Sequence, residues 1–273
     1  MECDSRRVSG RGIVLIPRAF ITEWGRVVPW PTVEQAEQDL LLSRLIVDIA
    51  NHDYLGDELV FRGGTCLHKL HAPEPLRYSE DLDYVRSTRG GIRGITTAVS
   101  KIGERLGMRV STSVGEYPKI ILRAPFETGE GQMRVKVEVN TRERSPHHPL
   151  VRVPFRVESS WFAGEAEVLT FSIEEVLASK IRALYQRSKG RDVFDLWFGL
   201  TRLGVMGSSI VEAFAPYRPD GINRNKAERN LREKVMKASF RRDLRPLVAA
   251  LPGEYDIDAA AELIVSEVLA GFE

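Results

Sequence analysis

Two aspartates separated by one residue, Asp81 and Asp83, are the strongest candidates for chemistry in this 273-residue chain. The segment from Asp81 to Val85 alternates polar and apolar residues, a pattern that predicts a β-strand. Residues two apart on a strand project from the same face, so the two carboxylates would lie close together. Two such charges are unfavourable without a cation between them, and Mg²⁺ binds few protein carboxylates alongside waters and substrate phosphates. We therefore expect a Mg²⁺ site here, with Mn²⁺ as the alternative ion, although Asp-x-Asp is also common on solvated surfaces.

A glycine pair lies upstream of these acids. Gly63 and Gly64 follow a short apolar strand and precede a helical segment over residues 66–71. Glycine lets the backbone approach a ligand closely, and the free N–H groups of a helix N-terminus favour phosphate. Thr65 adds a hydroxyl at the same place. The pattern predicts a phosphate-binding turn beside the metal site, with a plain tight turn as the alternative.

A third acid is available on a second predicted strand, residues 133–140. Its valines line one face, while Glu138 shares the other face with Arg134, Lys136 and Asn140. Two-metal transfer chemistry uses such an acid to help clamp the attacking and leaving oxygens. Glu138 is therefore a candidate metal ligand. The alternative is a solvated strand face of alternating charge.

Lys180 occupies an unusual position on a predicted helix. The helix begins after Ser172, and Glu175 completes its capping box. At about 100° per residue, Lys180 falls near the middle of the apolar stripe. A buried ammonium needs a partner, and a triphosphate would supply one. A lysine that extends to solvent at the edge of the lobe is the alternative.

A basic loop, residues 187–191, follows that helix. Its cations are suited to phosphate, and we assign Arg191 to nucleotide binding. Asp192 is expected to cap the next helix, with Asp195 in its first turn.

These residues fall into two regions of different character. Up to about residue 171 helical and strand-like segments alternate, with strands expected at 59–62, 81–85, 119–123, 133–140, 151–157 and 166–171 and helices at 32–51 and 92–106. After Ser172 every segment is predicted helical, namely 173–187, 193–203, 210–214, 223–236, 239–250 and 259–271. We predict a bi-lobed α+β protein: a mixed-sheet lobe with an N-terminal arm over residues 1–171 and a helical lobe over residues 172–273.

The composition excludes some classes of protein but does not indicate a binding partner. The chain has 39 Lys and Arg against 38 Asp and Glu, so net charge does not indicate nucleic acid. Two cysteines give neither a disulfide framework nor a cysteine zinc site. No apolar run approaches the roughly 20 residues of a membrane helix, and the first residues lack a signal-peptide core. A cytoplasmic protein without a membrane partner is expected.

Two stretches carry a local excess of basic residues. Residues 218–245 hold ten Lys or Arg against four Asp or Glu, and a loop contains Arg142, Arg144, His147, His148 and Arg152. Such stretches can take an RNA backbone if they face the cleft. Solvated faces with interleaved acids are the alternative.

Four stretches together resemble the AbiEii/AbiGii-type nucleotidyltransferase toxins, the group that includes the MenT toxins: residues 61–70, 77–83, 175–184 and 189–195. The resemblance implies a polymerase-beta-like nucleotidyltransferase lobe followed by a helical lobe. It also implies a set of site residues. Gly63, Gly64 and Thr65 would hold the triphosphate; Asp81, Asp83 and Glu138 would bind metal; Lys180 would bind phosphate; and Asp195 would be a further active-site acid.

The resemblance implies a function as well. The chain would be a toxin that a separate antitoxin protein neutralises. It would transfer NMP from an NTP to RNA, expected to be the 3′ acceptor end of tRNA, and so block translation. Nucleotidyl transfer to a protein or a small molecule is the rival within enzymes. A catalytically inactive module that binds a nucleotide or a partner is the rival outside them.

Overall fold

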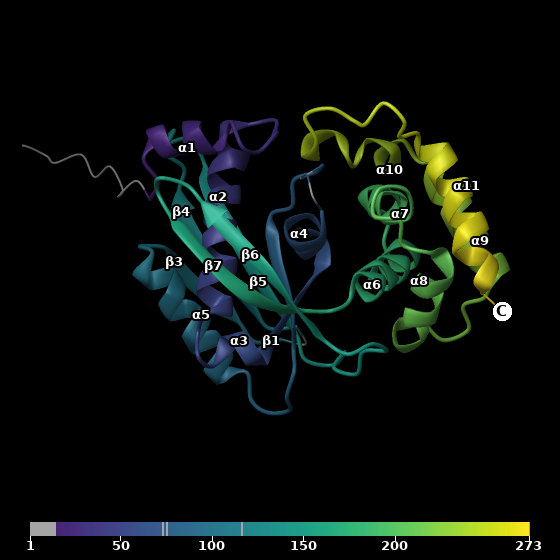
Figure 1. The fold of residues 1–273 in the computed structure, drawn as a ribbon, viewed down its shortest axis with the longest axis horizontal. Coiled ribbons are helices and arrows are strands. Elements are labelled where there is room, and N and C mark those ends of the chain that lie inside the picture. The colour runs from purple at the N-terminus through teal and green to yellow at the C-terminus, as the bar shows by residue number, and fades with distance from the viewer. Residues whose placement is uncertain (1–14, 73, 75, 116, 273) are drawn as a thin grey trace, which may run out of the picture.

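A seven-stranded mixed sheet forms the centre of the N-terminal lobe in the computed structural model, which describes residues 15–72, 74, 76–115 and 117–272 (Figure 1). The strand order is β3-β4-β5-β2-β1-β7-β6. The pairs β2–β5 and β1–β7 are parallel and the others are antiparallel. The strands are β1 (Leu59–Arg62), β2 (Asp81–Arg86), β3 (Arg109–Ser113), β4 (Lys119–Pro125), β5 (Gln132–Asn140), β6 (Val151–Glu158) and β7 (Ala163–Thr170). The predicted bi-lobed α+β class is confirmed; β3 was not predicted.

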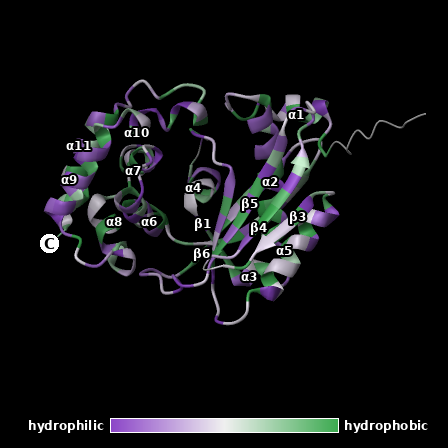
Figure 2. Ribbon diagram, turned by 180° about the vertical axis from the view of Figure 1, so that it is seen from behind, coloured by the Kyte–Doolittle hydropathy of each residue, from purple (hydrophilic) through white to green (hydrophobic). Residues whose placement is uncertain are grey.

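Helices cover one face of this sheet and leave the other to the site. Helix α2 (Val33–Ala50) packs on β5, β6 and β7, and α5 (Arg93–Arg105) packs on β3 and β4. The short helices α1 (Arg18–Trp24) and α3 (Leu55–Glu58) lie beside α2. Hydrophobic residues gather on the strands and on the inner sides of the helices (Figure 2). The alternation along β5 follows from this, since its valines are buried while Lys136 and Glu138 are only partly covered.

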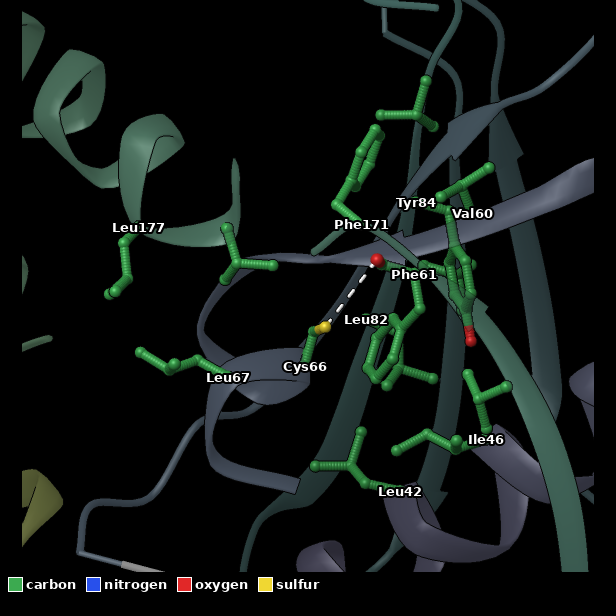
Figure 3. Packing of buried hydrophobic residues seen from close by; sticks show 14 of the residues in the cluster. Leu42, Ile46, Val60, Phe61, Cys66, Leu67, Leu82, Tyr84, Phe171 and Leu177 are labelled. Carbon is green, nitrogen blue, oxygen red and sulfur yellow. Dashed lines mark hydrogen bonds between the residues drawn. The ribbon is translucent and has the colours of Figure 1, made fainter. Parts of the chain in front are cut away.

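The glycine pair starts a helix that changes its winding. Helix α4 (Gly63–Cys66) begins three residues before the predicted helix and runs directly into a π-helical turn, Leu67–His71. The turn is closed by the Ala72 N–H, which donates to the Leu67 carbonyl at 3.1 Å. Cys66 points into the core, where its thiol lies 3.7 Å from the Phe61 carbonyl oxygen (Figure 3). Burial raises the pKa of this thiol to about 12.

The C-terminal lobe is helical, as predicted. It contains α6 (Ile173–Gln186), α7 (Arg191–Thr201), α8 (Gly207–Ala213), α9 (Arg224–Val235), α10 (Ala238–Arg242) and α11 (Ile257–Glu267), with 3₁₀ turns at 215–217, 245–247 and 269–271. The helix predicted over 239–250 is wrong beyond Arg242, because Pro246 lacks the N–H that a continuing helix needs. The cap predicted at Asp192 is also wrong: Gly190 takes the N-cap position of α7.

Several contacts join the two lobes besides the chain itself. The Tyr78 N–H donates to the Leu247 carbonyl at 2.7 Å, and the Gln35 amide donates to the Pro246 carbonyl at 2.8 Å. The Glu175 carboxylate on α6 accepts the N–H groups of the two residues 147 and 148 at 2.6 and 3.0 Å. Within the described residues, none of the helices combines the length and the apolar character needed to cross a membrane.

Candidate active site

The register of three strands brings the predicted acids together. In the parallel pair β2–β5, Asp81 lies beside Lys136 and Asp83 beside Glu138, and Arg62 on β1 faces Asp83 from the other side. Asp83 and Glu138 line a cavity of about 380 Å³ between the lobes. The remaining lining residues are Arg62, Gly63, Gly64, Tyr84, Tyr117, Asn140, Glu143, Ser179, Lys180, Arg182, Ala183, Gln186 and Arg187.

The two glycines are required by the space around them. Gly63 has φ +85°, and a Cβ there would lie 2.5 Å from Asp83 Oδ2. A Cβ on Gly64 would lie 2.6 Å from Arg77 Nη2. Neither position leaves room for a side chain, so the start of α4 lies directly against the Asp83 carboxylate. The first N–H groups of this helix have no partner within it and are suited to phosphate oxygens.

Thr65 has a different place from the one expected. Its side chain is buried, at 2% exposure, and its hydroxyl lies 2.9 Å from Ser79 Oγ and donates to the Asp81 carbonyl. Thr65 therefore fixes the start of β2 against the glycine turn, and its hydroxyl points away from the cavity.

A lysine to which the sequence pattern assigned no role lies among the acids. Lys136 Nζ is 3.1 Å from Asp81 Oδ2 and 3.3 Å from Glu138 Oε2. Lys119 Nζ, on β4, is 3.5 Å from the same Glu138 oxygen. Burial lowers the pKa of Lys136, but the carboxylates of Asp81 and Glu138 outweigh burial and raise it overall. Burial and the neighbouring Asp81 raise the pKa of Asp83.

The donor set fits one divalent cation. Asp81 and Asp83 share a strand face beside the glycine turn, and Mg²⁺ needs only one or two carboxylates when substrate phosphates complete its shell. The third acid is placed differently, because the Glu138 carboxylate is held by two lysines. In the part of the chain that the structure describes, no three His, Cys, Asp or Glu side chains converge as a metal site.

Lys180 has a protein partner. Its ammonium lines the cavity from α6, is 4% exposed and lies 2.7 Å from Asp195 Oδ2. The same carboxylate accepts two bonds from Arg77, at 2.7 and 2.6 Å, and lies 3.1 Å from His68 Nε2. Asp195 itself is fully buried behind Lys180 and does not line the cavity. It therefore anchors a cation of the site, where a direct active-site acid was expected.

This network sets the charge states of its members. Burial would raise the pKa of Asp195, but Arg77 and Lys180 hold it well below the usual range. Burial and the Arg77 charge lower the pKa of His68 to about 4, so His68 is neutral at pH 7. The π-helical turn presents His68 to Asp195.

Among the basic residues of the loop, Arg187 lines the cavity and Arg191 does not. Two bonds at 2.7 and 2.8 Å join Arg187 to Asp192, and they raise the pKa of Arg187 further. Arg191 Nε instead lies 3.5 Å from Asp243 Oδ2, in the C-terminal lobe. This placement does not support the expectation that Arg191 contacts the nucleotide, whereas Arg187 lines the cavity.

A glutamate binds two further cavity arginines. Glu143 accepts bonds from Arg62 at 2.6 Å and from Arg182 at 2.5 and 2.8 Å. Burial opposes its ionisation, but the two guanidinium groups outweigh burial and lower its pKa to about 2. No sequence pattern predicts this contact, because its members lie on β1, α6 and a loop.

Several residues of the two basic stretches pair with acids. In the first, Arg224, Arg232 and Arg241 pair with Glu228, Glu262 and Asp258. Helix α9 lies at the outer edge of the helical lobe, on the side away from the sheet (Figures 1 and 2). In the second, Arg152 binds Asp57 and His147 lies 3.4 Å from Glu212. The alternative of solvated, paired faces therefore describes these five basic residues.

Comparisons with known proteins found one family model and several solved structures similar to this chain. The family model described as nucleotidyl transferase AbiEii toxin, type IV TA system, matches residues 44–263. No curated protein matches the sequence significantly. The solved structure of JHP933 from Helicobacter pylori is 15% identical with a TM-score of 0.50, covering 87% of this chain and 90% of that one. MenT4, a nucleotidyltransferase toxin from Mycobacterium tuberculosis H37Rv, is 16% identical with a TM-score of 0.49, covering 91% of this chain and 99% of that one.

Proposed function

We propose that this chain, which belongs to the AbiEii nucleotidyltransferase toxin family of type IV toxin–antitoxin systems, transfers NMP from an NTP to the 3′ end of an RNA acceptor in the cytoplasm. The family membership confirms the resemblance seen in the sequence. The observation that carries the proposal is the placement of Asp83 directly against Gly63, with Lys180 lining the same cavity. Acidic ligands, a helix N-terminus and a cation are the parts that triphosphate positioning requires.

Each group has a proposed role in the transfer. The N–H groups at the start of α4 and the Lys180 ammonium hold the triphosphate. Glu138 faces the acceptor 3′-hydroxyl, which gives up its proton to water and attacks the α-phosphorus while the bond to pyrophosphate breaks. Mg²⁺, or Mn²⁺ in its place, would be held by Asp81 and Asp83 and would neutralise phosphate charge. Catalysis is then positioning and charge neutralisation.

The acceptor proposed is the 3′ acceptor end of tRNA, so that transfer blocks translation until the antitoxin neutralises the protein. The cavity wall supports a nucleotide-chain acceptor, since an exposed aromatic ring, Tyr117, and the polar side chains of Asn140 and Gln186 line it. Exposed aromatic rings stack on bases of any sequence. Family membership remains the main support for an RNA acceptor.

Labelled NTP transfer onto total cell extract tests the proposal. Wild-type protein is expected to label RNA, whereas Asp81→Ala loses transfer by at least about 100-fold while keeping its fold, because a charged group at the reacting phosphates is removed. Asp220→Ala, at an exposed loop position of the helical lobe, is the matched control and keeps full activity.

The rival functions give different results in the same assay. Label that runs with protein or small molecules and never with RNA refutes the RNA acceptor. Tight NTP binding without pyrophosphate release supports the inactive binding module. A folded Asp81→Ala protein that still transfers nucleotide contradicts the proposed site.

A further inference from the structure

Lys136 occupies the place of a cation between two acids. Its ammonium is 3.1 Å from Asp81 and 3.3 Å from Glu138, and it is partly covered by the sheet. The strand register fixes this position, since Lys136 lies beside Asp81 on the neighbouring strand and two residues before Glu138.

The charges around the site explain why a built-in cation is useful. Asp81, Asp83 and Glu138 carry three negative charges on one sheet face, and such a group repels itself without counter-charge. Lys136 and Lys119 contribute two positive charges, so these three acids and two lysines sum to minus one before any ion binds. One divalent cation would bring this sum to plus one, which suits an anionic triphosphate, and a second cation would lie against the Lys136 ammonium.

We propose that Lys136 is a positioning residue that serves as a permanent counter-ion of Asp81 and Glu138, so that the site takes one divalent cation per chain. Lys136 keeps Glu138 turned toward the acceptor side and away from direct metal binding. This inference rests on the proposed use of Asp81 and Asp83 as metal ligands. It revises the expectation that Glu138 is a third ligand.

Counting bound Mn²⁺ tests the inference without measuring activity. Titration of the full chain with Mn²⁺ alone, followed by the electron paramagnetic resonance signal of the free ion, is expected to give one bound ion per chain. Lys136→Met should bind a second ion or bind the first at least about tenfold more tightly, because a unit charge about 4 Å away is removed from a partly covered site. Lys136→Arg keeps the charge and should stay at one ion.

Lys119→Met is the matched control. It removes the same charge from the adjacent strand, but Lys119 is more exposed and contacts only Glu138 of the three acids, at 3.5 Å. Its ion count should remain one, with an affinity change of less than about threefold, since solvent screens exposed charges.

Two results overturn the inference. One is a wild-type chain that binds two ions with similar affinity, which decides the matter even if Lys136→Met does not fold. The other is equal behaviour of the folded Lys136→Met and Lys119→Met variants. Failure of the proposed function looks different: the Mn²⁺ count would stand, while the wild-type protein would transfer no nucleotide.

Discussion

Replacing Asp195 by asparagine would remove the negative charge that two buried cations share between the lobes. Arg77 donates two bonds to this carboxylate, at 2.7 and 2.6 Å, and Lys180 lies 2.7 Å away. An amide of the same shape keeps the packing but leaves Arg77 without this counter-charge and Lys180 with the more distant Asp192 carboxylate, at 3.9 Å. Breaking a buried ion pair by removing one partner costs about 3–5 kcal/mol, so we expect Asp195→Asn to lower the free energy of unfolding by that amount.

Urea unfolding at pH 7 measures this loss, with Lys180→Met as the comparison. That variant leaves Asp195 with both Arg77 bonds, so we expect a smaller loss of about 1–2 kcal/mol. Because the pKa of Asp195 is depressed in the folded chain, its contribution is fully present above the ordinary aspartate range and disappears as pH falls through the folded pKa. An Asp195→Asn protein within 1 kcal/mol of wild type would refute the anchoring role.

Three further variants test separate features. Gly63→Ala should destabilise the chain by about 1–3 kcal/mol and weaken NTP binding in calorimetry, because its φ of +85° and the nearby Asp83 exclude a Cβ; unchanged binding would argue against a required glycine turn. The buried Glu37 carboxyl accepts the Glu127 N–H, and burial raises the pKa of Glu37 to about 7. The protonated carboxyl therefore stabilises the fold fully below about pH 4.5, and this contribution is lost as pH rises through 7. Glu37→Gln should therefore be more stable than wild type by about 1–2 kcal/mol at pH 8 and by little at pH 5 in thermal melts; equal melts at pH 8 would count against this. Glu143→Gln should lose about 1–3 kcal/mol in urea at every pH from 5 to 8, because the pKa of about 2 keeps the native carboxylate ionised throughout.

The sequence was sufficient for features that local pattern determines. Alternation along residues 133–140 predicted β5, and the glycine pair predicted a close turn. The capping residue Ser172 was also correct, since its hydroxyl accepts the Glu175 N–H. The strand β3 was not predicted because its residues, Arg109–Ser113, are polar except for Val110 and mostly exposed, so they show no apolar alternation.

Features that depend on register or on distant partners could not be predicted. The sequence placed Lys136 on the polar face of a strand, but only the parallel pairing of β2 with β5 shows that it meets Asp81. Lys180 was correctly read as buried, yet its partner Asp195 lies on the next helix, and helix packing decides which side chains meet. Arg77, the third member of that network, follows a proline-rich loop and carries no periodic signal.

The attachment of the C-terminal lobe at residues 245–247 bears on how substrates reach the site. This segment hydrogen-bonds to Tyr78 and Gln35, far along the chain from the connection near residue 171. Attachments at two separate places oppose the hinge opening that many two-lobed enzymes use, because one attachment must break before the lobes can move apart. We therefore expect the entrance of the cavity to keep a nearly constant width as NTP and acceptor bind. Lobe closure should then not limit the rate of turnover.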